Sequence, residues 1–229
     1  MSLAELKNGY LASGSEDSTI RIWNVNTGLA TNTLTAHTGP IRTLVSLQNG
    51  YLASAGNDMT IRLWNVNDWS IIKNMTGHSN GIGFIAELKS GNLASCSWDK
   101  TIKIWNVNNG SAIRTISGLA SMVFSLAVLQ NGYLASSDAS GIIGIWDTDT
   151  GLSLRNITAH SSSIWALALL QNGYLVSGSD DSTIYVWNTN SGLKITTLTG
   201  NNLLVRTLVV LQNGYIASAC NDHYIRIWN

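Results

Sequence analysis

Six tryptophans at a constant spacing of 41 residues constrain the fold of this chain more than any other feature. They occur without any insertion or deletion, at Trp23, Trp64, Trp105, Trp146, Trp187 and Trp228. Each one closes a short alternating segment such as Ile20-Arg21-Ile22-Trp23. A fixed period of this length indicates a repeat architecture, in which every unit packs on its neighbours. The period therefore predicts that residues 1–229 form one domain of six similar units.

Each period contains four predicted strands separated by turn residues. Between residues 40 and 76 these strands are predicted at 41–47, 51–55, 60–64 and 70–75. Asn49-Gly50 separates the first two, and Asn-Gly supplies the positive φ angles that a two-residue hairpin turn requires. No twelve-residue stretch has helical periodicity, which excludes a helical solenoid. Four short antiparallel strands in about 40 residues make one blade, so the sequence predicts an all-β β-propeller.

The units also share a specific set of residues. Each pairs a Gly-His-like dipeptide, a Ser-x-x-x-Asp segment and a closing Trp-Asn, with Trp146-Asp147 as the one Trp-Asp pair. On these residues the chain resembles the WD-repeat β-propeller family over essentially its whole length. The resemblance implies a buried hydrogen-bond chain in each blade, from His through Asp and Ser to Trp. Three units have the complete set: His37, Ser54, Asp58 and Trp64; His78, Ser95, Asp99 and Trp105; His160, Ser177, Asp181 and Trp187.

The other three units depart from this pattern. The first keeps Ser13, Asp17 and Trp23 but begins too late to contain its His. In the fourth, Leu119 replaces the His and Ser140 replaces the Asp. Joint loss is expected for residues in direct contact, because losing one alone would leave the other buried and unpaired. In the sixth unit Asn201 replaces the His while Asp222 remains, and we expect the amide to donate to the carboxylate.

Composition restricts the classes of partner. Thirteen Lys and Arg balance thirteen Asp and Glu, so no overall field attracts nucleic acid or an anionic membrane. No apolar run approaches the roughly 18 residues of a membrane span, and the first residues lack a signal-peptide pattern. We therefore expect no nucleic-acid partner, no membrane association and a cytoplasmic location. Cys96 and Cys220 have no CxxC spacing, which argues against a metal site or a disulfide framework.

The recurring Ser, His and Asp could suggest a hydrolase. However, the set repeats unchanged, and no copy adds a nucleophile elbow or an oxyanion device. The histidines of different units are also expected to lie too far apart to share a metal ion. The sequence therefore predicts a protein that is not an enzyme, with no catalytic residue, no metal and no cofactor.

Positions that differ among nearly identical units are where a specific function can lie. One precedes the turn Asp, and two others lie three and five residues after the His. In the family, these positions resemble those at the channel rim, on the face formed by the d–a and b–c loops, where strands a to d are those of one unit in order. This face is the usual partner-binding surface of the family. We expect an aromatic sector and, opposite it, a charged sector: Trp98, Met122, Phe124 and Trp165; Arg42, Arg206, Glu16 and Asp180.

Large aromatic and Arg side chains are typical of binding hot spots. The sequence thus favours a scaffold that binds a protein or peptide on this face. The alternative reading of the same residues is drift among recently duplicated units, with no ligand bound.

The strand count leaves the last unit incomplete. Strands a to c occur six times and strand d five times, and Met1 aligns with Arg42, inside a predicted strand a. The last blade is therefore predicted to end at Tyr224 to Trp228 as an open edge, and open edges recruit other strands. Three outcomes stay open: a ring with one three-stranded blade, self-association through the edge, or a segment of a longer array. The alternative function is a structural self-assembling module without a dedicated ligand.

Overall fold

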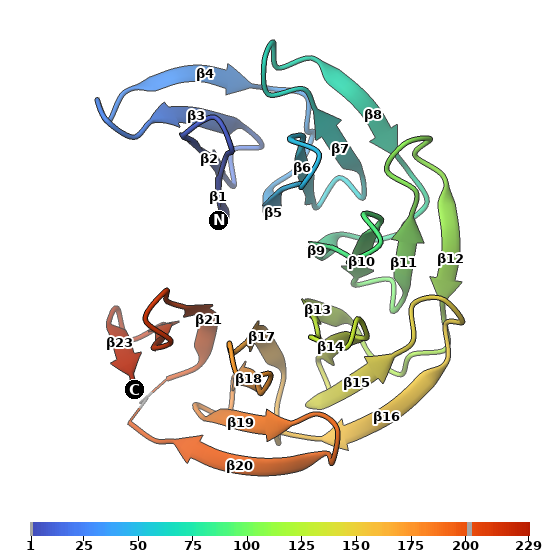
Figure 1. Cartoon of the computed structure of the whole chain (residues 1–229), viewed down its shortest axis with the longest axis vertical. Coiled ribbons are helices and arrows are strands. Elements are labelled where there is room, and N and C mark those ends of the chain that lie inside the picture. The colour runs from blue at the N-terminus through green and yellow to red at the C-terminus, as the bar shows by residue number, and fades with distance from the viewer. Residues whose placement is uncertain (1, 201–202) are drawn as a thin grey trace. The chain divides into compact units, whose positions relative to one another are not determined.

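The computed structural model describes residues 2–200 and 203–229, so Asn201 and the expectation attached to it lie outside the described part. Within those residues the regular elements are 23 strands. The same residues contain no helix that is long and apolar enough to cross a membrane. The chain divides into an N-terminal unit, residues 1–117, and a C-terminal unit, residues 118–229. Each unit contains three antiparallel sheets with consecutive strand order, and each sheet is one blade (Figure 1).

The N-terminal unit contains three four-stranded blades. Blade 1 comprises β1 (Ser2–Glu5), β2 (Tyr10–Gly14), β3 (Ile20–Asn24) and β4 (Ala30–Leu34). Blade 2 comprises β5 (Ile41–Ser46), β6 (Leu52–Gly56), β7 (Ile61–Trp64) and β8 (Ile71–Met75). Blade 3 comprises β9 (Ile82–Glu87), β10 (Leu93–Ser97), β11 (Ile102–Trp105) and β12 (Ala112–Ile116).

The C-terminal unit contains two four-stranded blades and one three-stranded blade. Blade 4 comprises β13 (Val123–Val128), β14 (Leu134–Asp138), β15 (Ile142–Trp146) and β16 (Ser153–Thr158). Blade 5 comprises β17 (Ile164–Leu169), β18 (Leu175–Ser179), β19 (Ile184–Asn188) and β20 (Leu193–Leu198). Blade 6 comprises β21 (Val205–Val210), β22 (Ile216–Cys220) and β23 (Ile225–Trp228).

The Asn-Gly turns set the register of the first hairpin in a blade. Gly50 has a φ of 89°, and its N–H donates to the Leu47 carbonyl at 2.9 Å. The Asn49 side chain accepts a hydrogen bond from the Tyr51 N–H at 3.0 Å, which closes the turn on its other side. With the turn fixed, Leu44 lies opposite Ser54 in the ladder between β5 and β6. The four strands predicted for this unit are confirmed, with bounds that differ by at most one residue.

The core lies between successive blades. Blade 1 contributes Ile20 and Ile22 to one cluster, and blade 2 contributes Leu44, Leu52 and Trp64. Because a neighbouring blade covers each face of an inner strand, β6 is buried along its whole length. Each fully buried aliphatic side chain of this kind contributes about 1.5–3 kcal/mol to folding. The packing of blade on blade therefore stabilises each unit.

The predicted fold class is confirmed. The chain is all-β and consists of six propeller blades, five with four strands and the last with three. Among the described residues β23 pairs with β22 alone, so the last blade ends in an open edge, as the strand count predicts. Ile225 and Ile227 on this strand are 74% and 54% exposed.

Candidate binding surface

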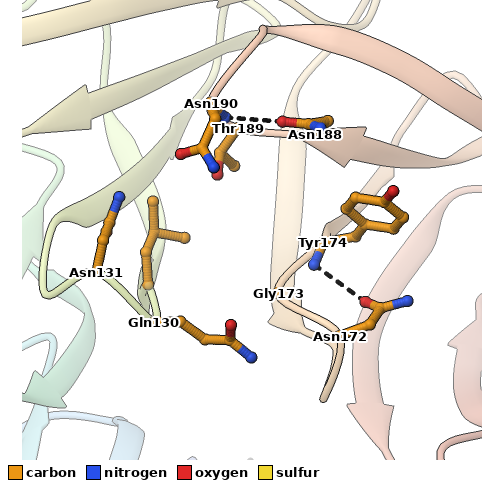
Figure 2. Close-up of a pocket in the computed structure, with 9 residues that line it drawn as sticks. Gln130, Asn131, Asn172, Gly173, Tyr174, Asn188, Thr189 and Asn190 are labelled. Atoms are coloured by element: carbon orange, nitrogen blue, oxygen red, sulfur yellow. Dashed lines mark hydrogen bonds between the residues drawn. The ribbon is translucent and has the colours of Figure 1, made fainter.

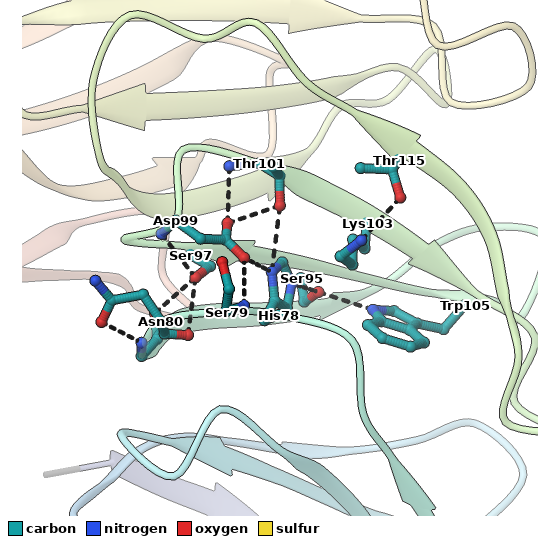
Figure 3. Close-up of polar contacts among 11 residues, drawn as sticks. His78, Ser79, Asn80, Ser95, Ser97, Asp99, Thr101, Lys103, Trp105 and Thr115 are labelled. Atoms are coloured by element: carbon teal, nitrogen blue, oxygen red, sulfur yellow. Dashed lines mark hydrogen bonds and ion pairs between the residues drawn. The ribbon is translucent and has the colours of Figure 1, made fainter.

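A buried chain of hydrogen bonds joins four side chains in blade 3 (Figure 3). His78 Nδ1 lies 2.7 Å from Asp99 Oδ2, and His78 Nε2 lies 2.7 Å from Ser95 Oγ. The Trp105 indole N–H donates to the same Ser95 oxygen at 2.8 Å. With Nδ1–H donating to the carboxylate, Nε2 accepts the Ser95 hydroxyl proton, and Ser95 Oγ remains an acceptor for Trp105. These hydrogen bonds connect the d–a loop, the b–c turn and strand c of the blade.

The pKa values of the histidine and the aspartate in this set of hydrogen bonds both lie below their ordinary values. Burial lowers the pKa of His78 below its ordinary value, although Asp99 acts in the opposite direction, so the ring is neutral at pH 7. Burial acts to raise the pKa of Asp99, but hydrogen bonds from Thr101, Ser79 and His78 outweigh it and lower that pKa. Ser95 is fully buried, so its oxygen is not accessible to a substrate. The arrangement links loops rather than activating a nucleophile.

Blade 2 repeats this chain and adds a cation. His37 joins Asp58 at 2.8 Å and Ser54 at 2.7 Å, and Trp64 donates to Ser54 at 2.8 Å. Arg62 Nη1 lies 2.7 Å from Asp58 Oδ2 in a nearly buried ion pair. Burial acts to raise the pKa of Asp58, but its bonds to His37 and Arg62 hold it well below the ordinary value.

Blade 5 repeats the chain with an aromatic neighbour in place of the Arg. His160 Nδ1 lies 3.0 Å from Asp181 Oδ2, and Nε2 lies 2.7 Å from Ser177 Oγ. Trp187 donates to Ser177 at 2.8 Å. Tyr185 stacks on the His160 ring with a centroid distance of 4.4 Å.

Blade 4 closes its b–c turn without the His–Asp pair. Asp138 Oδ1 accepts hydrogen bonds from the Ser140 N–H, the Ser140 hydroxyl and the Ile142 N–H, each at 2.9 Å. Sequence comparison of the units missed this residue, which stands two positions before the expected Asp. The signal was present, because an Asp two residues before a Ser commonly caps its own turn. In blade 6, Asp222 forms an ion pair with Arg226 at 2.7 Å.

The variable positions of the N-terminal unit gather around one arginine. Arg42, at the start of β5, donates from Nε to Asn57 Oδ1 at 2.9 Å. Its Nη1 lies 3.6 Å from Glu16 Oε1, and its Cζ lies 5.8 Å from the centre of the Trp98 ring. A Cβ on Gly81 would lie 3.0 Å from Trp98 Cε3, so the indole packs closely against the d–a loop and would have to shift to admit a larger residue there. These residues come from three successive blades.

The C-terminal unit holds a continuous stack at the equivalent positions. The Phe124 and Trp165 rings lie parallel to within 11° at a centroid distance of 4.2 Å. Arg206 Cζ lies 4.5 Å from the centre of the Trp165 ring. The Trp165 indole N–H donates to Asp180 Oδ1 at 2.6 Å, and Arg206 Nε donates to Asn221 Oδ1 at 3.4 Å. The stack therefore spans blades 4, 5 and 6.

These contacts correct one expectation from the sequence. The predicted separation of the charged residues from the aromatic residues is wrong, because Arg42 lies near the Trp98 ring and Arg206 lies over Trp165. Variable positions of successive blades are neighbours, and a guanidinium is attracted to the face of an indole. Trp98 belongs to the N-terminal unit, whereas Met122, Phe124 and Trp165 belong to the C-terminal unit, so a single aromatic sector stays a prediction.

A groove of about 320 Å³ lies between the hairpins of blades 4 and 5 (Figure 2). Most of its side-chain amides already serve their own turns. Asn172 Oδ1 accepts a bond from the Tyr174 N–H at 3.1 Å, and Asn188 Oδ1 accepts one from the Asn190 N–H at 3.0 Å. A similar hollow of about 300 Å³ lies between blades 1 and 2. Repeated turn chemistry therefore accounts for these grooves. Among the described residues no group of three His, Cys, Asp or Glu side chains could hold a metal ion.

Comparison with known proteins places these blades in a family. The model of the WD40 family, described as WD domain, G-beta repeat, matches residues 6–24, 28–65, 69–106, 151–188 and 192–229. The chain belongs to the WD40 family. The matched segments omit residues 107–150, which include β13, β14 and β15 of the blade that lacks the His–Asp pair.

A solved structure shows the same fold. The crystal structure of the WD40 beta propeller domain of Doa1 is similar, with a TM-score of 0.90 and 27% sequence identity over 100% of this chain and 78% of that chain. The comparison with curated protein sequences gave no match. WD40 propellers generally act as scaffolds for protein interactions.

Proposed function

We propose that this WD40 chain is a non-enzymatic scaffold that binds a protein or peptide where its d–a loops and b–c turns meet. The observation that carries the proposal is the stack of Phe124, Trp165 and Arg206. It occupies positions at which otherwise similar blades differ. Phe124 and Trp165 are half-buried, and Arg206 is exposed. Trp and Arg that are held in place on a surface are the side chains that most often dominate binding energy.

The contacts within the stack suggest which partner would bind. The Trp165 side chain is held by the Phe124 ring, by its hydrogen bond to Asp180 and by the Arg206 guanidinium. Binding a ligand there therefore costs little further side-chain entropy. The planar guanidinium of Arg206 suits a carboxylate. Met122 is 43% exposed and offers adaptable apolar contact. We infer that the ligand is a peptide segment with an acidic residue beside an apolar one.

The location of the protein is part of the same proposal. Cys96 and Cys220 are both buried and free of disulfides, which is typical of a reducing compartment. The formal net charge of zero supports a partner other than nucleic acid or an anionic membrane. We therefore place the function in the cytoplasm.

A displayed library of random peptides supplies the probe. Peptides selected on the immobilised chain would be labelled, and their affinities measured by fluorescence anisotropy. We expect Arg206→Ala and Phe124→Ala each to weaken binding by more than about tenfold, as hot-spot truncations do. Arg21→Ala is the matched control, because Arg21 is half-exposed on β3 and contacts no residue of the stack, so its loss should leave affinity unchanged.

Two results would refute the proposal. One is a library that yields no peptide with measurable affinity for the unaltered chain. The other is a set of peptides that bind both variants as tightly as the unaltered chain, with circular dichroism showing all variants folded.

A further inference from the structure

Three blades contain the same side-chain hydrogen bond between variable positions. The donor is the second residue of strand a, and the acceptor lies 15 residues later, immediately before the position of the turn Asp. The three pairs are Arg42 with Asn57 at 2.9 Å, Trp165 with Asp180 at 2.6 Å and Arg206 with Asn221 at 3.4 Å. The donor at the start of strand a therefore bonds to an acceptor of its own blade.

A carboxylate at the acceptor position can also reach the next blade. Glu16 Oε1 in blade 1 lies 3.6 Å from Nη1 of Arg42 in blade 2. The residue of blade 1 at the donor position is Met1, which lies outside the described residues and is of a type with no side-chain hydrogen-bond donor. The Glu16 carboxylate thus forms its ion pair with the arginine of the following blade.

Asp180 and Arg206 are the equivalents of this pair, four periods later in the sequence. In the described part of the C-terminal unit no ion pair joins them. Asp180 instead accepts the Trp165 N–H, and Arg206 Cζ lies 4.5 Å from the centre of the same indole ring. The carboxylate and the guanidinium therefore lie against one side chain. The indole holds the carboxylate because a hydrogen bond to a charged group generally contributes more than an exposed ion pair.

We propose that Trp165 is a positioning residue, whose N–H holds the Asp180 carboxylate and thereby keeps the Arg206 guanidinium unpaired for the carboxylate of a ligand. Arg206 Nε is bonded to Asn221, whereas its two Nη groups have no partner among the described residues of this unit. A guanidinium can bind one carboxylate through two N–H groups at once. This role of Trp165 rests on the proposed function, in which Arg206 receives an acidic residue.

A cycle of two substitutions tests this role with the peptides selected on the unaltered chain. Trp165→Phe keeps an aromatic ring beside Phe124 but removes the N–H, so Asp180 should pair with Arg206 and compete with the peptide. Asp180→Asn removes that competitor. In fluorescence anisotropy, Asp180→Asn should raise peptide affinity about fivefold more when Trp165 is replaced by Phe than when Trp165 is present. Fivefold corresponds to an exposed ion pair worth about 1 kcal/mol.

A crystal structure of the Trp165→Phe variant without peptide gives a second readout. We expect an Asp180 oxygen within about 4 Å of an Arg206 nitrogen, as in the pair of Glu16 with Arg42. Trp69→Phe is the matched control, because Trp69 lies in the turn between β7 and β8 and packs against the core of the N-terminal unit. That variant should bind the selected peptides as tightly as the unaltered chain.

Two results would overturn the proposal. One is an equal gain in affinity from Asp180→Asn with and without Trp165, which would indicate a general effect of charge. The other is a Trp165→Phe structure in which Asp180 and Arg206 stay apart. Failure of the proposed function is a different result, in which no peptide binds the unaltered chain or Arg206→Ala leaves affinity unchanged. The crystal structure then still decides whether the Trp165 N–H keeps the carboxylate from the guanidinium.

Discussion

The natural replacement of both His and Asp in blade 4 can be transferred to blade 3 as a double-mutant cycle. The substitutions are His78→Leu and Asp99→Ser, which copy Leu119 and Ser140, first singly and then together. The Asp99 side chain is only 6% exposed. The single variant His78→Leu therefore leaves a nearly buried carboxylate without its imidazole donor. The double variant removes both members of the bonded pair.

The magnitude follows from the bonds that each change removes. A hydrogen bond to a carboxylate is worth about 1.5–3 kcal/mol and a neutral one about 1 kcal/mol. His78→Leu therefore costs about 3 kcal/mol, because it loses the bond to Asp99 and the bond to Ser95. Asp99→Ser costs at least as much, because besides the bond to His78 it loses the bonds from the Ser79 N–H and from the Thr101 N–H and hydroxyl. The shared bond is lost only once in the double variant, so we expect a coupling of about 2 kcal/mol.

Urea and thermal unfolding measure this coupling. For a chain of this length, 2 kcal/mol corresponds to about 4–8 °C in the melting temperature. The matched control combines His78→Leu with Asp181→Ser in blade 5, and these two changes should add without coupling because the residues share no partner. Additive costs for the pair within blade 3 would refute the reasoning that the two residues depend on each other.

Three further predictions concern pH, one turn and the thiols. Burial lowers the pKa values of His78 and His160, so below the ordinary histidine pKa of 6.5 the unfolded chain binds protons that the folded chain does not. The melting temperature should therefore be constant above pH 7 and fall below about pH 6.5, and a constant melting temperature down to about pH 5 would contradict this. Lys100 has a φ of 64°, a left-handed conformation that strains a residue with a side chain, and blade 4 has Gly141 at the equivalent position. Lys100→Gly should therefore raise the free energy of unfolding by about 0.5–1 kcal/mol in urea, and a decrease would contradict the presence of this strain. Burial raises the pKa of both thiols, and Cys96 is 0% exposed against 9% for Cys220; an aromatic disulfide reagent should therefore modify Cys220 first and Cys96 only on unfolding, whereas equal rapid reaction would contradict the packing.

The repeated part of the structure could be predicted from the sequence because its causes are local and recur. The 41-residue period sets the number of blades, and turn chemistry such as Asn49-Gly50 sets the hairpins. The incomplete last blade followed from counting strands. Alternation of apolar residues, with both faces covered, accounts for the buried strands.

Two individual features were not predicted from the sequence. The turn cap by Asp138 has a local signal, but comparison of equivalent positions looks for an Asp two residues later and does not show it; the structure shows that two N–H groups of the b–c turn come within its reach. The stacking of Arg206 on Trp165 depends on the angle between neighbouring blades, so the residues were found but their grouping was not.

The signals of the nine tryptophan indole N–H groups in a nitrogen–proton correlation spectrum test the proposed binding surface most directly. Six of these groups donate to buried or half-buried Ser oxygens inside the blades, whereas the Trp165 N–H donates to Asp180 beside the stack. Titration with a peptide selected from the library should shift the Trp165 signal and leave the six Ser-bonded signals in place. A binding peptide that leaves the Trp165 signal unmoved, or that instead shifts the signal of Trp69 in the turn between β7 and β8, would contradict the proposed surface.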